Sequence, residues 1–250
     1  MGLDAFSLVP IVASPFIGSF LGVVALRLTA GRTVLFGRSS CDACGATLGP
    51  LDLVPLASFA ALRGRCRHCG ASIDRTHVAM EAGAVVVAVW AALVTSAWIV
   101  IASCVLGWTL LTLAAIDWRT GLLPDVLTLP LALAGLGVAY AIAPEMLLDH
   151  VIGAAAGFAV FAALAEFYRR LRGRHGLGLG DAKLLGAAGA WLGWNGLPTV
   201  VLYAAFIGLA LVLARRVRGE ALQAGDKLAF GPALAAATWL VWLYGPLVAG

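Results

Sequence analysis

Residues 79–116 read AMEAGAVVVAVWAALVTSAWIVIASCVLGWTLLTLAAI and contain a single charged side chain, that of Glu81. A helix needs roughly 20 apolar residues to cross the hydrocarbon core of a bilayer. This run is about twice that length, so one helix of this size would overshoot the membrane. The run therefore predicts two membrane-spanning helices, joined by a turn near Ser96-Ala97-Trp98.

The composition of the whole chain agrees with this interpretation. Of the 250 residues, 62% are hydrophobic and 12% are charged, whereas soluble domains carry about a quarter charged residues. Further apolar runs lie at 6–26, 122–143, 148–168, 181–214 and 228–249. The run 181–214 is again long enough for two passes, with a turn at Trp194-Asn195-Gly196-Leu197-Pro198. We expect an all-α integral membrane protein with about eight transmembrane helices, and not a soluble helical protein.

The basic residues predict the orientation, because they favour short cytoplasmic loops. With the N-terminus outside, the inner loops are 27–78, 117–121, 169–180 and 215–227. These loops hold all 17 lysines and arginines except Lys183, which lies just inside the sixth span. The outer loops carry Asp4, Glu145 and Asp149 instead. The net charge of +4 is thus a topology signal, and we expect no nucleic-acid partner.

The start of the chain, Met1-Gly2-Leu3-Asp4, lacks the basic residues of a signal peptide, so we expect the first span to remain as a helix. The charges and spans together predict three parts. These are a first transmembrane helix at 1–29, a cytoplasmic loop domain at 30–78 and a transmembrane core at 79–250.

The cytoplasmic loop contains two C-x-x-C pairs, Cys41-Asp42-Ala43-Cys44 and Cys66-Arg67-His68-Cys69. Two such pairs at this separation are typical of a structural zinc site with four thiolate ligands. Gly45 and Gly70 directly after the pairs permit the tight turn of each knuckle. Disulfides are the alternative, but a cytoplasmic compartment keeps thiols reduced. The sequence predicts a zinc-ribbon-like loop, since so short a segment needs a metal to fold.

Two aspartates lie at the predicted cytoplasmic edge of the membrane. Asp117 ends the third span, and Asp181 begins the sixth. Ionisable groups at such a depth are costly, which makes a functional role the first hypothesis. Two facing carboxylates cannot easily both ionise, which leaves one as a base toward water and one as an acid toward a carbonyl. The alternatives are a helix cap for Asp181 and a surface charge paired with Arg119 for Asp117.

Several characteristic blocks follow one another along the chain. They are Gly18-Ser19-Phe20-Leu21 with Arg27-Leu28, the two cysteine pairs with Leu53-Val54-Pro55-Leu56-Ala57-Ser58 and Arg63-Gly64-Arg65-Cys66 between them, Asp117 to Thr128, Gly178-Leu179-Gly180-Asp181-Ala182-Lys183-Leu184-Leu185 and Phe230-Gly231-Pro232. In these blocks the chain resembles the type IV prepilin peptidases. The resemblance covers nearly the whole chain. It implies a G-x-G-D aspartic protease whose catalytic pair is Asp117 and Asp181, with Gly178, Gly180, Asp125 and Lys183 in supporting positions.

The resemblance also implies a substrate and a second activity. Such enzymes lie in the bacterial inner membrane, with the N-terminus periplasmic and the active site facing the cytoplasm. They remove the basic leader of type IV prepilins or type II secretion pseudopilins by cutting after a glycine. Many then methylate the new N-terminus with S-adenosylmethionine, an activity associated with the cytoplasmic loop, here including Gly64 and nearby Glu81.

The chain departs from the family pattern at three places. These are Gly22, the stretch Thr76-His77-Val78-Ala79 and Ala229. None of them touches the two aspartates, but the first two flank the cytoplasmic loop and bear on methyl transfer. Two alternative functions remain open at this point. One is a transporter or channel with intramembrane carboxylates, although no internal repeat is found, and the other is a methyltransferase without peptidase activity.

Overall fold

The computed structural model describes residues 5–32, 39–172, 178–219 and 230–247. Asp4, Ala229 and parts of three predicted inner loops, at 33–38, 173–177 and 220–227, lie outside the described residues. The elements in chain order are α1 (Ala5–Thr29), η1 (Pro50–Leu53), α2 (Ala57–Ala61), α3 (Arg75–Val94), α4 (Ile99–Thr120), α5 (Asp125–Ile142), η2 (Pro144–Met146), α6 (Leu147–Arg172), α7 (Leu179–Val217) and α8 (Gly231–Tyr244). The described part contains no strand, apart from two isolated β-bridges.

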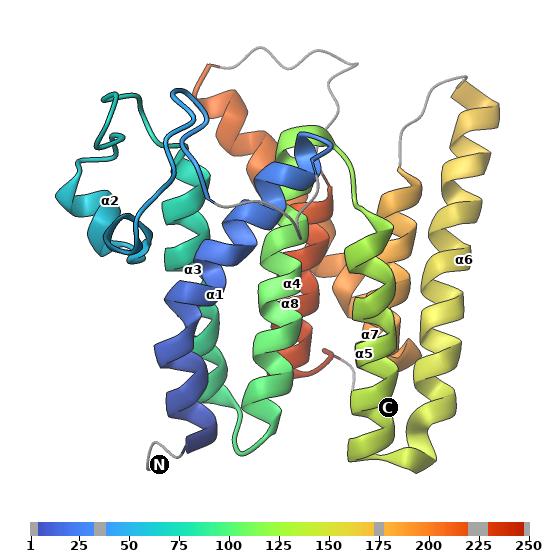
Figure 1. Ribbon diagram of the computed structural model, residues 1–250. Coiled ribbons are helices and arrows are strands. Elements are labelled where there is room, and N and C mark those ends of the chain that lie inside the picture. The colour runs from blue at the N-terminus through green and yellow to red at the C-terminus, as the bar shows by residue number, and fades with distance from the viewer. Residues whose placement is uncertain (1–4, 33–38, 173–177, 220–229, 248–250) are drawn as a thin grey trace. The chain divides into compact units, whose positions relative to one another are not determined.

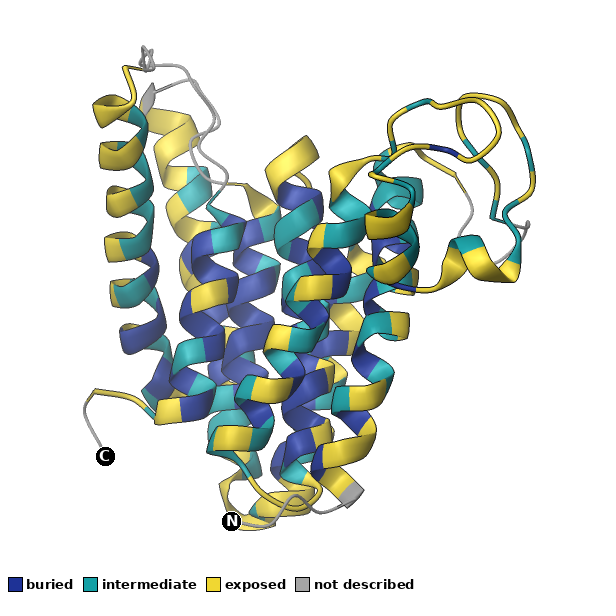
Figure 2. Ribbon diagram, turned by 90° about the vertical axis from the view of Figure 1, so that its left-hand side faces the viewer, coloured by how far each residue is buried: buried dark blue, intermediate teal, exposed yellow. Residues whose placement is uncertain are grey.

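Six of the described helices are long and apolar enough to cross a membrane, namely α1, α3, α4, α5, α6 and α7. Figure 2 colours many residues of these helices yellow, which marks them as exposed. Large apolar residues are among the exposed ones, and Val12 and Leu133 are each 69% exposed. Outward apolar faces of this kind are what a lipid environment accommodates. The prediction of an all-α membrane protein is confirmed. The α8 helix has 14 residues, and eight passes remain a prediction.

The chain divides into two compact units, Met1–Ala115 and Ile116–Gly250. In the first unit α1 packs closely on α3, because Gly18 has no side chain. A Cβ on Gly18 would lie 2.6 Å from the Cα of Glu81. The indole Nε1 of Trp108 on α4 donates to the carbonyl of Ala84 on α3 at 3.0 Å. Helix α3 ends at Val94 and α4 begins at Ile99, which confirms the predicted turn near residues 96–98.

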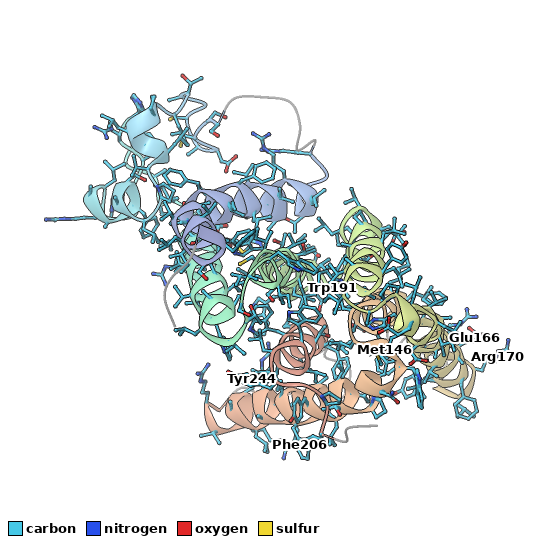
Figure 3. All side chains as sticks on the ribbon, turned by 90° about the horizontal axis from the view of Figure 1, so that it is seen from below. Met146, Glu166, Arg170, Trp191, Phe206 and Tyr244 are labelled. Carbon is cyan, nitrogen blue, oxygen red and sulfur yellow. The ribbon has the colours of Figure 1, made fainter. Side chains whose placement is uncertain are left out.

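In the second unit α6 and α7 meet along glycines. A Cβ on Gly189 would lie 2.1 Å from the carbonyl oxygen of Gly153, and one on Gly157 would lie 2.6 Å from the carbonyl oxygen of Leu185. Such contacts let helix backbones approach closely in a membrane, where dispersion replaces the hydrophobic effect as the source of association. On another side of α7 the Nε1 of Trp191 donates to the carbonyl of Leu131 on α5 at 2.8 Å. Figure 3 shows Trp191 inside the helix array and Phe206 on its outer side.

Helix α7 is bent sharply at Gly193, where φ is 71° and ψ is 174°. Only glycine adopts this conformation without strain. Figure 1 shows the first arm of α7 running downward and the second arm running back up toward the left. The predicted turn at Trp194–Pro198 is therefore wrong in position. Those residues lie within the second arm, and the chain reverses at the single residue before them.

Candidate active site

Asp117 lies near the C-terminal end of α4 and is 5% exposed. Its Oδ2 accepts a hydrogen bond from the backbone N–H of Gly231 at 3.0 Å. Gly231 is the first residue of α8, and the free N–H groups at a helix N-terminus favour a nearby negative charge. A Cβ on Gly231 would lie 2.6 Å from the same carboxylate oxygen. The backbone can approach Asp117 in this way because residue 231 is a glycine.

Asp181 lies in the first turn of α7 and is 9% exposed. Its Oδ2 accepts the N–H of Gly178 at 3.2 Å, and its own N–H donates to the carbonyl of Gly178 at 3.1 Å. Gly178 is the N-cap of the helix. The alternative that Asp181 itself caps α7 is therefore wrong, although its carboxylate does satisfy one free N–H at the helix end. A Cβ on Gly180 would lie 3.0 Å from the Cβ of Leu123.

The two aspartates belong to the same compact unit, Ile116–Gly250. The carboxylate of Asp117 exerts a Coulombic effect on that of Asp181. The structure thus brings together two carboxylates that are 64 positions apart in the sequence, both of them largely shielded from water. Each carboxylate accepts a backbone N–H from the start of a helix, Asp117 from Gly231 of α8 and Asp181 from Gly178, the N-cap of α7. A pair of this kind can exchange protons with a bound water and a carbonyl group.

Asp125 and Lys183 form an ion pair, in which Lys183 comes from the same helix as Asp181. The Nζ of Lys183 lies 2.5 Å from Oδ1 of Asp125, and the two side chains are 32% and 55% exposed. Asp125 is the first residue of α5, and Lys183 lies two residues beyond Asp181. The pair therefore links the starts of α5 and α7, next to the buried aspartate. The sequence grouped these residues by resemblance, and the structure shows their direct contact.

Two further contacts at this site were not predicted from the sequence. One is the N–H of Gly231, and the other is the guanidinium of Arg215, which lies 5.2 Å from the ring centroid of Trp118. Trp118 directly follows Asp117, so the cation–π contact fixes the end of α4 against the second arm of α7. The block Phe230-Gly231-Pro232 resembles the family pattern and so pointed to Gly231, but not to its contact with Asp117.

The four cysteines of the two C-x-x-C pairs form one cluster in the first unit. The sulfur atoms of Cys41, Cys44, Cys66 and Cys69 all lie within 4.8 Å of one another, and Sγ of Cys41 is 3.9 Å from Sγ of Cys69. Tetrahedral zinc with Zn–S bonds of about 2.3 Å separates its sulfur ligands by about 3.8 Å. The cluster therefore fits a metal ion with four thiolate ligands.

Each knuckle is closed by backbone hydrogen bonds. The N–H of Gly45 donates to the carbonyl of Cys41 at 2.8 Å, and that of Gly70 donates to Cys66 at 2.9 Å. Both glycines have positive φ, 70° and 73°, as the tight turns require. Hydrogen bonds from the backbone N–H groups of Cys44 and Ala43 lower the pKa of the Cys41 thiol to about 7. A thiol that ionises near neutral pH is a better metal ligand.

Gly64 and Glu81 occupy different places in the first unit. Gly64 has a φ of 69° and packs on the ring of Phe59, since a Cβ there would lie 2.9 Å from Phe59 Cζ. Glu81 is 7% exposed on α3. Its Oε2 accepts the backbone N–H of Leu56 at 2.7 Å, a residue held at a φ of 59°. Glu81 thus holds the loop that precedes α2.

Comparisons with known proteins cover most of the chain. Residues 104–213 match the Type IV leader peptidase family, and residues 12–95 match the bacterial Peptidase A24 N-terminal domain. A prepilin leader peptidase/N-methyltransferase of Burkholderia pseudomallei is 43% identical over 210 residues, 84% of this chain and 68% of the relative.

Two more relatives carry the same name. The Aeromonas hydrophila protein is 39% identical over 213 residues, covering 83% of this chain and 72% of its own length. The Pseudomonas aeruginosa protein is 32% identical over 266 aligned residues, and the alignment covers 96% of this chain and 91% of that protein. No solved structure shows significant similarity. On these matches, the chain belongs to the type IV leader peptidase family.

Proposed function

We propose that this protein is a membrane aspartic endopeptidase that removes the leader peptide from type IV prepilins or type II secretion pseudopilins. The observation that carries the proposal is the pair of buried carboxylates, Asp117 and Asp181, which lie at helix ends within one compact unit. Relatives named prepilin leader peptidase/N-methyltransferase supply the substrate class.

The chemistry follows from two carboxylates that share one proton. The ionised carboxylate takes a proton from a water molecule, whose oxygen attacks the carbonyl carbon of the scissile peptide bond. The protonated partner gives its proton to the carbonyl oxygen, which forms a tetrahedral diol. Collapse of the diol delivers a proton to the amide nitrogen and breaks the C–N bond. We assign neither role to one residue, because a coupled dyad titrates as a pair.

We place the cleavage at the cytoplasmic face of the bacterial inner membrane, after a glycine of the substrate, with the N-terminus of the enzyme in the periplasm. The concentration of basic residues in the predicted inner loops supports this orientation. A prepilin leader is basic and the mature segment begins as a membrane helix. Its cleavage site would therefore meet the aspartates at the interface, where water for hydrolysis is available.

We also propose that methylation of the new N-terminus follows cleavage, as the names of the relatives imply. S-adenosylmethionine would supply the methyl group. This methyl donor carries two positive groups, a sulfonium and an ammonium, and one negative carboxylate, so its net charge is positive. The cleft beside Gly64 is lined by Arg63, Arg65 and Arg75 and does not suit such a cation. We therefore assign no step of methyl transfer to that cleft.

The cysteine cluster is proposed to hold structural zinc within a cytoplasmic loop domain at 30–78. Four thiolates fill a tetrahedral site and leave no position for a reacting water. When bound, the ion would cross-link the two knuckles that Gly45 and Gly70 close. The residues 1–29 and 79–250 would then supply the membrane part of the enzyme.

The test is cleavage of a purified prepilin by the full-length protein in detergent. Wild type is compared with Asp117→Asn and Asp181→Asn, which remove a charge while keeping the shape of the side chain. A matched control is Glu145→Gln, which changes an exposed carboxylate on η2. We expect wild type and the control to cleave after the glycine, and both aspartate variants to cleave about a thousandfold more slowly.

Intact substrate with wild type would overturn the peptidase proposal, as would cleavage at the wild-type rate by either aspartate variant. Labelled S-adenosylmethionine added with a pre-cleaved peptide separates the second activity. Methyl transfer without any cleavage would establish the alternative, a methyltransferase alone. A transporter or channel, the other alternative, would give neither product.

A further inference from the structure

The first unit contains a cleft with an unusual concentration of positive charge. It has a volume of about 490 Å³ and is lined by Phe59, Arg63, Gly64, Arg65, Ser72, Ile73 and Arg75. Three arginines thus line one cleft together with the apolar residues Phe59 and Ile73. Like charges so placed repel one another and are stabilised by an anion between them.

The walls of the cleft are fixed by backbone contacts. Arg63 and Gly64 both have positive φ, 50° and 69°, and such a conformation is strained for arginine. Arg65 forms an antiparallel bridge with Ser72, and the N–H of Ile73 donates to the carbonyl of Gly64 at 2.8 Å. The two segments that carry the arginines are therefore held together before any ligand arrives.

The three arginines differ from the paired cations of the chain. Among the described residues, ion pairs join Arg32 to Asp42, Arg67 to Asp52, Arg169 and Arg170 to Glu166, and Lys183 to Asp125. Figure 3 shows Glu166 beside Arg170 at the edge of the molecule. In the same described part, no carboxylate is ion-paired with Arg63, Arg65 or Arg75.

The place of the cleft along the chain points to the membrane surface. Arg75 is the first residue of α3, which is long and apolar enough to span the bilayer from Arg75 to Val94. A group at the start of such a helix lies at the level of the lipid headgroups. Phosphate is the anion found there, and the planar guanidinium forms two parallel hydrogen bonds with its oxygens.

We propose that the cleft formed by Arg63, Arg65 and Arg75 binds a phosphate-bearing anion, supplied by the headgroup of an anionic phospholipid or by free phosphate. The guanidinium groups contact the phosphate oxygens. Phe59 and Ile73 face the apolar part of a lipid where one is present. Occupation of the cleft would hold the cysteine loop at the membrane surface. The inference does not depend on the peptidase or methyltransferase proposals.

The experiment measures lipid binding to the full-length protein in neutral detergent by native mass spectrometry. Phosphatidylglycerol, which is anionic, is titrated against phosphatidylcholine, which has no net charge. The cleft variant is Arg63→Gln with Arg65→Gln. The matched control is Arg169→Gln with Arg170→Gln, which removes the same charge from arginines that are paired with Glu166. A second arm titrates inorganic phosphate as a competitor.

We expect wild type and the control to bind phosphatidylglycerol in preference to phosphatidylcholine. The cleft variant should bind phosphatidylglycerol at least about tenfold more weakly than wild type does. Binding of inorganic phosphate alone, lost in the cleft variant, would identify the source as free phosphate and support the anion site. Equal anion binding by wild type and the cleft variant would overturn the proposal. So would equal losses in both double variants, or no binding of either anion by wild type. Unchanged circular dichroism confirms that each variant is folded.

Discussion

The contact between Gly231 and Asp117 shows how a glycine, which has no side chain, lets the backbone position a carboxylate. The N–H of Gly231 reaches Oδ2 of Asp117 at 3.0 Å across 114 positions of sequence. Any side chain at residue 231 would enter the space of the carboxylate, since even a Cβ would lie 2.6 Å from Oδ2 and 2.8 Å from Cγ. The orientation of Asp117 therefore depends on this glycine.

A methyl group at this position is expected to disturb activity more than folding. We predict that Gly231→Ala lowers the rate of prepilin cleavage about 100-fold, because a shift of the carboxylate by about 1 Å is enough for such a loss. The control is Gly137→Ala on α5, where a Cβ meets nothing within 4 Å. The cleavage rates and the thermal unfolding of both variants are measured. A Gly231→Ala enzyme with wild-type rate would show that the contact does not position Asp117.

At this scale the sequence predicted the charged groups but not the groups that bind them. Asp117 and Asp181 stand out in the sequence because carboxylates at a membrane edge are costly. The partners of Asp117 and Trp118 are a backbone N–H and an arginine of distant segments. Such contacts depend on how helices pack, and no local pattern encodes them. Only the ordered family blocks pointed to Gly231.

Among the helices, α6 packs closely against the first arm of α7, which carries Asp181 in its first turn. Gly153 and Gly189 touch through their backbones, so no side chain can give way if one is enlarged. We predict that Gly189→Ala lowers the melting temperature, because overpacking costs about 1–3 kcal/mol and exceeds the gain in helix propensity. The control is Gly208→Ala in the second arm of α7, where the nearest atom is 3.7 Å from the new Cβ. Equal melting temperatures for the two variants would contradict this packing argument.

The cysteine loop offers a separate prediction. We expect one zinc ion per chain by elemental analysis, and its loss in Cys41→Ser, because the remaining three thiolates cannot close the tetrahedron. The loop should then become sensitive to protease, since it is too short to fold without the ion. Cys104→Ser is the matched control, as Cys104 is buried within α4, away from the cluster. If Cys41→Ser retains zinc, or if wild type contains none, the assignment of a zinc site is contradicted.

The two helix turns show what apolar length can and cannot predict. Length alone predicted the turn at residues 96–98, because two passes cannot fit in one straight helix. In the run 181–214 the Asn, Gly and Pro cluster pointed to residues 194–198, yet the chain reverses at Gly193. A positive φ is available to any glycine, and Gly186, Gly189, Gly193 and Gly196 all lie in this run, so the sequence offered several candidates for the bend.

For the molecule as a whole, the distribution of basic residues predicts which loops face the cytoplasm, and this topology can be tested. The predicted outer loop between the fourth and fifth spans contains Glu145, and the predicted inner loop after Asp117 contains Gly121. Both residues are exposed. We predict that a membrane-impermeant maleimide labels Glu145→Cys on intact cells, and labels Gly121→Cys only after permeabilisation. The unmodified chain, with its own cysteines, is the background control. The reverse pattern would contradict the cytoplasmic placement of the aspartates.

The central claim is that Asp117 and Asp181 act as one catalytic pair, and kcat/KM for prepilin cleavage tests it most directly. The rates of wild type, Asp117→Asn, Asp181→Asn and the double variant are compared under one set of conditions. We predict that each single change lowers kcat/KM by about a thousandfold, and that the double variant is no slower than the singles, because residues that act as a unit are not additive. A single variant with wild-type kcat/KM, or losses that multiply in the double variant, would contradict the account.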